Sequence, residues 1–261
     1  MGRYWRIYSQ FFRSSIQREL EFRANFFAKV LQNAVWLFFF FTVLLVIYRN
    51  TDSVGGWNRG DAIVLAATVF IMTSIMWAFC HSLYEVPEQV RKGTLDFVVV
   101  KPIDSQFWVS LRRFRFEQLG SMIAGLILLG YGLSQVTRAP DWQDWLAYLT
   151  LFMVSGLLYY SLILALMTLS IYFVRIDNLW VLGETVIDVA RFPMSIFSPA
   201  IQNIITFWIP FAFLASLPAM QLVRGADWKL VAVGLTWTLV GLFVSRWFWR
   251  FSLRRYTSAS S

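Results

Sequence analysis

Six long apolar segments, separated by polar gaps, dominate the hydropathy pattern of this 261-residue chain. They cover roughly residues 30–48, 62–83, 119–136, 145–174, 194–223 and 230–249. A helix needs about 20 apolar residues to cross the hydrocarbon core of a bilayer, and each segment is near or above that length. The pattern therefore predicts an all-α integral membrane protein with six transmembrane helices.

The basic residues are distributed unevenly among the polar gaps. Of the 23 Lys and Arg residues, 18 lie in the N-terminal arm (1–29), in the gaps 84–116 and 175–193, and at the C-terminal end, whereas the other three gaps hold five. Basic residues collect on the cytoplasmic side of a membrane, so both chain ends are expected there. The expected units are a cytoplasmic interfacial helix (1–29), a transmembrane domain (30–250) with a cytoplasmic loop at 84–116, and a cytoplasmic tail (251–261).

Two polar segments have an amphipathic pattern. In residues 3–16, apolar side chains recur at three- and four-residue spacing while Arg3, Arg6 and Arg13 project elsewhere, which predicts a helix lying on the membrane surface. The alternative is a basic, disordered leader. Glu184, Asp188 and Arg191 have a similar spacing and predict a second interfacial helix, with a solvated loop as the alternative.

Composition agrees with a membrane location. Hydrophobic residues make up 58% of the chain and charged residues 15%, below the roughly 25% of soluble domains. The net charge of +8 falls entirely on the predicted cytoplasmic side, where anionic lipids attract it, so no nucleic-acid partner is needed to explain it. The single cysteine, Cys80, adjoins the single histidine, His81, and neighbours on a helix do not share a face, so no metal site is expected. We expect a multi-pass protein of the plasma (inner) membrane.

Two of the predicted spans have internal features. Ser121 and Gly125 have the four-residue spacing of small side chains that lets membrane helices approach closely. The fifth span, counted with Pro193 directly before it, contains four of the seven prolines, and we expect helix breaks there at Pro199, Pro210 and Pro218, because proline removes a backbone hydrogen bond.

The sequence contains no motif that supplies energy or catalysis. It has no phosphate-binding GxxxxGK[ST] loop, no HExxH and no GxSxG, and no ionisable residue lies deep within an apolar segment. Proton-coupled carriers and intramembrane proteases generally place such residues there. We therefore expect no catalytic residues, no metal and no cofactor in this chain, and an energy source on another protein.

The polar gap 84–116 contains Glu88, then Gly93-Thr94-Leu95-Asp96, the apolar patch Val98–Val100 and Pro102. This order of residues resembles the first cytoplasmic loop of the permease subunits of ABC-2 type exporters. In that family the loop has an acidic short helix, then Gly-Thr-Leu-(Asp/Glu), an apolar patch and a proline. The six spans, the basic N-terminal helix and the prolines of the fifth span extend the resemblance. The departure is Val98–Val100, where the family usually has leucines.

The resemblance implies a function, a set of partners and a set of site residues. The chain would be the membrane subunit of an ATP-driven exporter, with ATP and Mg bound by two copies of a separate ABC ATPase. A second permease half, identical or paralogous, would complete the assembly in the lipid bilayer. The loop 84–116 would couple to the ATPase, with Glu85, Glu88 and Arg91 as polar contacts and Leu95 and Phe97 as apolar anchors. The full set of implied coupling residues is Glu85, Pro87, Glu88, Arg91, Gly93, Thr94, Leu95, Asp96, Phe97 and Pro102. The alternatives are a non-transporting membrane scaffold or assembly protein, and a secondary transporter.

Overall fold

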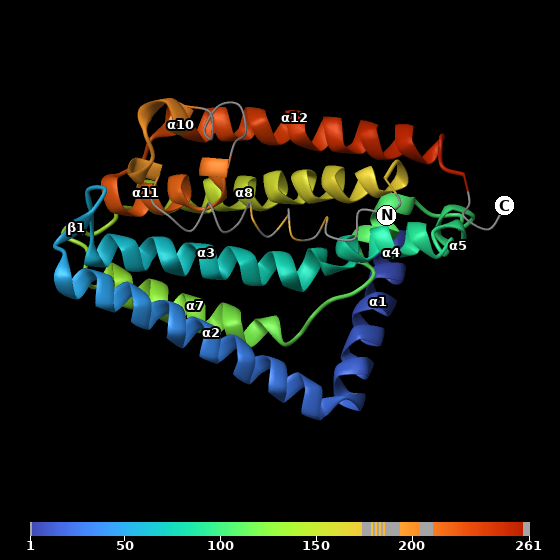
Figure 1. The fold of residues 1–261 in the computed structure, drawn as a ribbon, viewed down its shortest axis with the longest axis horizontal. Helices are drawn as coiled ribbons and strands as arrows, with labels where there is room; N and C mark the ends of the chain where they lie inside the picture. The colour runs from blue at the N-terminus through green and yellow to red at the C-terminus, as the bar shows by residue number, and fades with distance from the viewer. Residues whose placement is uncertain are drawn as a thin grey trace.

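The computed structural model describes residues 2–173, 194–203 and 211–257, together with 179, 181, 183 and 185. Within them, four helical segments are long and apolar enough to cross a membrane. They are built on α2 (Arg23–Asn50), α3 (Arg59–Cys80), α8 (Trp142–Thr168) and α12 (Trp228–Leu253). A shorter apolar helix, α7 (Gln118–Leu133), lies beside α3, and these five helices run side by side along one long axis (Figure 1). The chain is an all-α membrane protein, as predicted.

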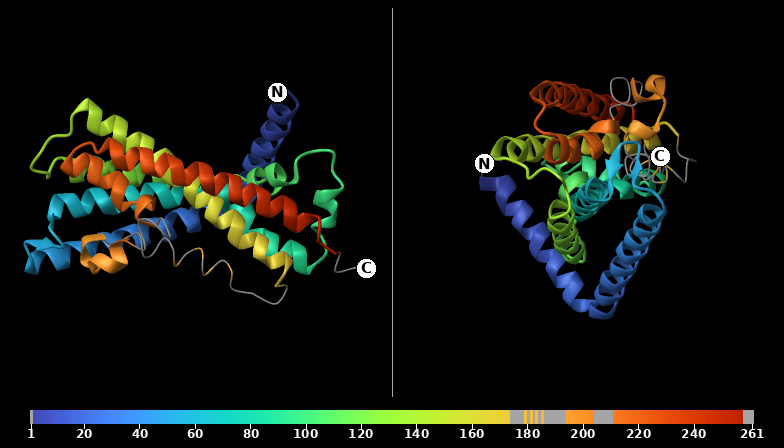
Figure 2. Two further views of the ribbon diagram at one scale, coloured as in Figure 1. Left: turned by 90° about the horizontal axis from the view of Figure 1, so that it is seen from above. Right: turned by 90° about the vertical axis from the view of Figure 1, so that its left-hand side faces the viewer.

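The N-terminal segment forms a helix, α1 (Gly2–Glu21), which is longer than the amphipathic stretch predicted at 3–16. Phe22 interrupts the helix with φ −108° and ψ 51°, and α2 begins at the next residue. Figure 2 shows α1 and α2 meeting at an elbow that stands away from the other helices. None of the 28 residues of α2, all of them described, is buried within the chain.

A tight hairpin joins α2 to α3. Strands β1 (Ser53–Val54) and β2 (Trp57–Asn58) pair antiparallel, with Ser53 opposite Asn58. Gly55 and Gly56 both have positive φ (57° and 77°), as a two-residue hairpin turn requires. Trp57 is buried, so the hairpin fixes the start of α3.

Small residues bring α3 and α7 into close contact. Ser121 and Gly125 are buried on the face of α7 that packs against α3. A Cβ atom at Gly125 would lie 2.6 Å from Cγ1 of Ile71, and one at Gly132 would lie 2.9 Å from Cγ2 of Ile63. Only glycine permits this approach, so the packing role predicted from the spacing of Ser121 and Gly125 is confirmed.

The region predicted as the fifth span consists of short elements in its described parts. These are η3 (Met194–Ile196), α10 (Pro199–Asn203), η5 (Phe211–Leu214) and α11 (Ser216–Arg224). Pro199 begins α10 and Pro218 lies in the first turn of α11, positions where a missing backbone N–H removes no helical hydrogen bond. Pro210 lies outside the described residues, as do Glu184, Asp188 and Arg191.

The buried core follows α3 and α8. Ile63, Leu65, Leu151, Ile163 and Leu164 are almost completely buried. Helix α8 packs against α12 on one side and against α11 on another. A short 3-10 turn, η2 (Leu169–Ile171), extends α8 towards the polar end of the molecule, where the candidate site lies.

Candidate functional site

Short helices gather at the end of the bundle where α3, α8 and α12 finish. They are η1 (His81–Glu85), α4 (Val86–Arg91), α5 (Asp96–Val99) and α6 (Ser105–Leu111). The start of α1 and the end of α12 lie at the same end (Figure 1). All four short helices come from the polar gap 84–116 or its border.

Local sequence accounts for the turn between α4 and α5. Pro87 lies in the first turn of α4, where its missing N–H is harmless. Gly93 has φ 69°, the left-handed conformation that ends a helix, and its N–H donates to the carbonyl of Val90 at 3.1 Å. Both ends of α4 are therefore set by local sequence.

The α4–α5 turn has one buried and one exposed side. Val86, Val90, Leu95 and Val98 point into the core and are at most 4% exposed. The opposite side, which we call the exposed α4–α5 face, combines charged, polar and apolar side chains. It consists of Glu88, Arg91, Lys92, Thr94, Phe97, Val99 and Val100. Phe97 and Val100 are 68% and 78% exposed, so this face carries apolar area beside its charges.

Two residues expected to contact a partner are engaged within the chain. The Glu85 carboxylate forms ion pairs with Arg112 and Arg113, and its side chain is only 18% exposed. It therefore fixes η1 against the segment that leads to α7. Leu95 is fully buried, so it anchors the turn from inside and cannot itself present an apolar surface. Of the two expected apolar anchors, only Phe97 is accessible.

The charged residues on the exposed α4–α5 face lie close together. Glu88 forms an ion pair with Lys92 one turn later, with Oε1 and Nζ 2.6 Å apart, and both side chains are more than half exposed. Asp96 lies on the side towards the C-terminal tail, where burial and the neighbouring Asp96 carboxylate raise the pKa of Tyr256 to about 12. The tail therefore packs beside α5.

Helix α6 is held by both ends of the chain. Arg246 of α12 donates to Asp104 and, at 2.6 Å, to Oε1 of Gln106. These hydrogen bonds from Arg246 hold the pKa of Asp104 below its usual value. From the other terminus, Nη2 of Arg3 donates to the carbonyl of Pro102 at 2.8 Å. Pro102, the last of the predicted coupling residues, therefore lies in a segment that is hydrogen-bonded to both α1 and α12.

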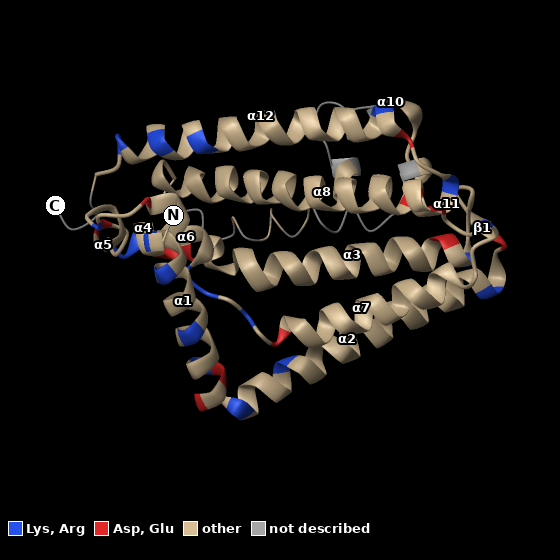
Figure 3. Cartoon of the chain, turned by 180° about the vertical axis from the view of Figure 1, so that it is seen from behind, with Lys and Arg blue, Asp and Glu red and all other residues tan. Residues whose placement is uncertain are grey.

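A second ion cluster ties α2 to the start of α7. Glu117 is completely buried, and its Oε1 lies 2.6 Å from Nε of Arg115 and 3.6 Å from Nζ of Lys29. Burial, together with the nearby Glu117 carboxylate, raises the pKa of Glu19 in α1. Lys and Arg residues are concentrated at this end of the molecule, along α1, at α4 and in the last turns of α12 (Figure 3). The distribution of charge along the sequence predicts that these basic residues lie at one membrane face, but it does not identify their partners.

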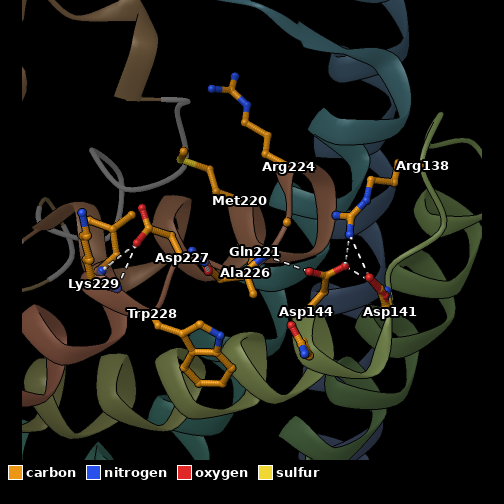
Figure 4. A pocket seen from close by; sticks show the side chains of 13 residues that line it. Arg138, Asp141, Asp144, Met220, Gln221, Arg224, Ala226, Asp227, Trp228 and Lys229 are labelled. Carbon is orange, nitrogen blue, oxygen red and sulfur yellow. Dashed lines mark hydrogen bonds and ion pairs between the residues drawn. The ribbon is translucent and has the colours of Figure 1, made fainter.

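A polar pocket of about 790 Å³ lies at the opposite end of the bundle, between the start of α8 and the segment joining α11 to α12 (Figure 4). Its most buried charged group is Asp144, which is 2% exposed and accepts from the backbone N–H of Ala226 at 2.8 Å. Nη2 of Arg138 lies 2.8 Å from the same carboxylate. These groups satisfy one another and clamp the two segments together.

The described part of the chain offers no metal site, since it contains no suitable group of three or more His, Cys, Asp or Glu residues. Cys80 is a free, buried thiol. The accessible part of the candidate site is the exposed α4–α5 face.

Comparison with known proteins identifies the family of the chain. The sequence model of the ABC-2 family transporter proteins matches residues 34–260, which is most of the chain. No curated protein and no solved structure matches it. The matched region includes the α4–α5 turn and every helix of spanning length except the first residues of α2. The chain belongs to the ABC-2 family of transporter proteins and is a membrane permease of an ABC transporter.

Proposed function

We propose that this chain is the permease subunit of an ATP-driven exporter in the plasma membrane, and that the exposed α4–α5 face docks onto its ABC ATPase. The observation that carries the proposal is the two-sided α4–α5 turn. Its buried valines and Leu95 make it continuous with the core of α3 and α8, while Glu88, Arg91 and Phe97 face outward. A partner that moves this face therefore acts on a packed element.

The composition of the face suits a protein partner. Central aromatic and arginine side chains contribute most of the binding energy in many interfaces, with other charged residues around them. Phe97 and Arg91 supply these residue types, and the pair Glu88–Lys92 lies beside them. The chain has no phosphate-binding loop, so ATP hydrolysis has to occur on the partner, with ATP and Mg bound there.

The complete transporter would contain two ATPase copies and a second permease half, identical or paralogous. The apolar faces of α2 support a neighbour in the membrane, because α2 buries none of its described residues in its own chain and exposes Phe27, Phe38 and Phe39. A permease neighbour or lipid would cover this surface.

We further propose six crossings, with α7 and the short elements of residues 194–224 adding two to the four long helices, and both termini in the cytoplasm. The distribution of basic residues supports this orientation. Cysteines introduced at Ser53 and Ala139 should react with an impermeant maleimide in intact cells, and one at Val100 should not. Native Cys80 is buried and gives a low background. Labelling at Val100 from outside would reverse the orientation.

The docking proposal is tested by charge reversal on the exposed face. The double variant Glu88→Lys/Arg91→Glu keeps the net charge and alters exposed side chains, so the permease should still fold and insert. Co-purification with the ATPase should fall, because paired charges at a protein interface contribute about 2–5 kcal/mol when desolvated. Phe97→Ala should also reduce co-purification with the ATPase.

The matched control is Arg49→Glu/Asp52→Lys, an exposed pair of opposite charges at the other end of the bundle. It should leave ATPase association unchanged. Equal co-purification and ATP hydrolysis by the Glu88/Arg91 variant and the control would reject the docking assignment. That result would favour a non-transporting membrane scaffold or a secondary transporter.

A further inference from the structure

An apolar groove opens on the side of the bundle between α7 and α12, with α3 and α8 as its floor. Its volume is about 840 Å³, within the 300–1,000 Å³ of typical ligand sites. Its walls are formed mainly by flexible and aromatic apolar side chains, including Met72, Met76, Phe79, Met122, Met153 and Leu157. Helix α2 and the described elements of residues 194–224 contribute no lining residue, so the groove is separate from the free faces of α2.

The groove has a polar inner end. There the start of α6 lies across it with Asp104 and Gln106, and Arg246 approaches from α12. The hydroxyl of Tyr160 in α8 accepts from Nε2 of Gln106 at 2.8 Å, so this end is an ordered hydrogen-bonded cluster. An occupant with an apolar body and a polar end would match both parts.

The dimensions fit one leaflet of a bilayer. The lining of α8 extends from Phe152 to Tyr160, which is about 12 Å at 1.5 Å per residue. Half of the ~30 Å hydrocarbon core is about 15 Å. A transmembrane helix of a second copy would need a groove open along the whole bilayer, whereas α6 closes this one at its inner end. The geometry therefore favours an acyl chain over a helix.

The basic residues at the inner end of the groove favour an occupant whose polar end is negatively charged. Arg246 is paired with Asp104, and Arg250 lies one turn further along the same face of α12 and is exposed. Arg3 reaches the same place from α1, since it donates to Pro102 and its neighbour Tyr4 packs edge-on against Phe107, a groove residue. Arg246 alone pairs with the Asp104 carboxylate, and Arg3 and Arg250 add two further positive charges at this end of the groove.

We infer that this groove is a binding site for one anionic phospholipid of the inner leaflet, with its acyl chains along α3 and α8 and its phosphate among Arg3, Arg246 and Arg250. The site lies on the membrane-facing side of the bundle and does not depend on the identity of the transported substrate. A bound lipid would join α12 and α1 to the segment that carries the exposed α4–α5 face.

The apolar part is tested with Met153→Trp in the full-length protein. Met153 is 67% exposed, so a larger side chain should be tolerated by the fold while it occupies the groove. Native mass spectrometry of purified protein titrated with phosphatidylglycerol should show one tightly bound lipid. Because the indole would take the place of the acyl chain, the bound-lipid peak of Met153→Trp should be lost or strongly reduced. The control is Leu239→Trp, at a 69% exposed position of α12 outside the groove, which should bind as the unmodified protein does.

The head-group part is tested with Arg3→Gln/Arg250→Gln. Each basic residue near a membrane surface contributes about fivefold to anionic lipid affinity, so the preference for phosphatidylglycerol over phosphatidylcholine should fall by about 25-fold. The control is Arg13→Gln/Arg254→Gln, which removes two exposed arginines from the same end of the molecule. It should keep the preference.

Three results would overturn the inference. Met153→Trp and Leu239→Trp could bind phosphatidylglycerol equally well, or the unmodified protein could bind phosphatidylcholine as tightly as phosphatidylglycerol. A disulfide between Met153→Cys residues of two copies in native membranes would show that a second copy covers the groove. None of these results bears on ATPase co-purification, so the proposed function is tested independently.

Discussion

Replacing Asp144 should destabilise the end of the bundle that lies opposite the exposed α4–α5 face. Asp144 is the third residue of α8, and its buried carboxylate accepts from two backbone N–H groups at 2.8 Å, those of Asp141 and Ala226. The first bond caps α8, and the second attaches the segment before α12 to it (Figure 4). Arg138 forms an ion pair with the same carboxylate but is 43% exposed.

The magnitude follows from these three partners. Hydrogen bonds to a charged acceptor contribute about 1.5–3 kcal/mol each to folding. Ala226 and Asp141 lie near the surface, and water would replace part of both bonds, so Asp144→Ala should cost about 2–4 kcal/mol. The exposed ion pair with Arg138 should contribute under ~1 kcal/mol. Asp144→Asn keeps one acceptor oxygen and should cost about half as much as Asp144→Ala.

Thermal unfolding of the purified protein in detergent measures these differences. For a chain of this size, 1 kcal/mol corresponds to about 2–4 °C, so Asp144→Ala should lower Tm by about 5–15 °C. The control Arg138→Gln removes the ion pair and leaves both backbone bonds in place, and it should lower Tm by less than about 4 °C. Equal shifts for Asp144→Ala and Arg138→Gln would contradict the assignment of the stability to the backbone donors.

Three further predictions concern packing, pH and the candidate site. Gly132→Val should lower Tm by separating α7 from α3, whereas Gly130→Val should not, because a Cβ at Gly130 has no neighbour within 4 Å. The ionised Asp104 carboxylate should stabilise the fold above its ordinary pKa of 3.8, and this stabilisation should be lost as the pH falls through its lowered pKa in the folded protein. Asp104→Asn should therefore have a lower Tm than the unmodified protein at pH 7, and this difference should shrink below pH 4. Glu85→Gln should increase the rate of proteolysis within residues 84–103 without changing Tm, because η1 loses the ion pairs of Glu85 with Arg112 and Arg113. An unchanged rate of digestion would show that these ion pairs do not fix η1.

Local sequence signals account for the long helices and for the turn at Gly93, because the forces that form them act within a few residues. Continuous apolar runs fix the central parts of α3, α8 and α12. A glycine after a short amphipathic helix ends it through its own backbone freedom. The start of α2 at Arg23 was less apparent, since its first residues are polar and precede the apolar run that begins near residue 30.

The partners of the charged residues could not be predicted, because they lie far away in the sequence. Glu85 was expected to face a partner protein, and its nearest cations in sequence are Arg91 and Lys92. The fold instead places Arg112 and Arg113 against it. Likewise, Asp104 pairs with Arg246, which is 142 residues away. Periodicity assigns a residue to a face of a helix but does not specify which other helix meets that face.

The apolar patch at Val98–Val100 is one feature in the family resemblance, but the fold divides it into a buried and an exposed part. Val98 is 4% exposed and belongs to the core, whereas Val99 and Val100 are exposed beside Phe97. A turn of helix rotates successive side chains by about 100°, so three adjacent residues cannot all face one way. Substitution of Val98 should therefore affect folding, and substitution of Val100 should affect docking if the proposed function is correct.

The contacts around α6 also indicate which helices would move if a partner displaced the exposed α4–α5 face. The turn is packed into α3 and α8 through Val86, Val90 and Leu95, and its continuation at Pro102 and Asp104 is bonded to Arg3 of α1 and Arg246 of α12. Helix α2, in contrast, has no buried residue and is attached at this end mainly through Lys29 and the elbow at Phe22. A displacement of the face would therefore act on α3, α8, α12 and the start of α1 through direct contacts, whereas at this end it would reach α2 through the elbow and Lys29. Under the proposed function, nucleotide-driven movement of the ATPase would change the angle between α2 and the rest of the bundle, next to the surface where a second permease half is expected.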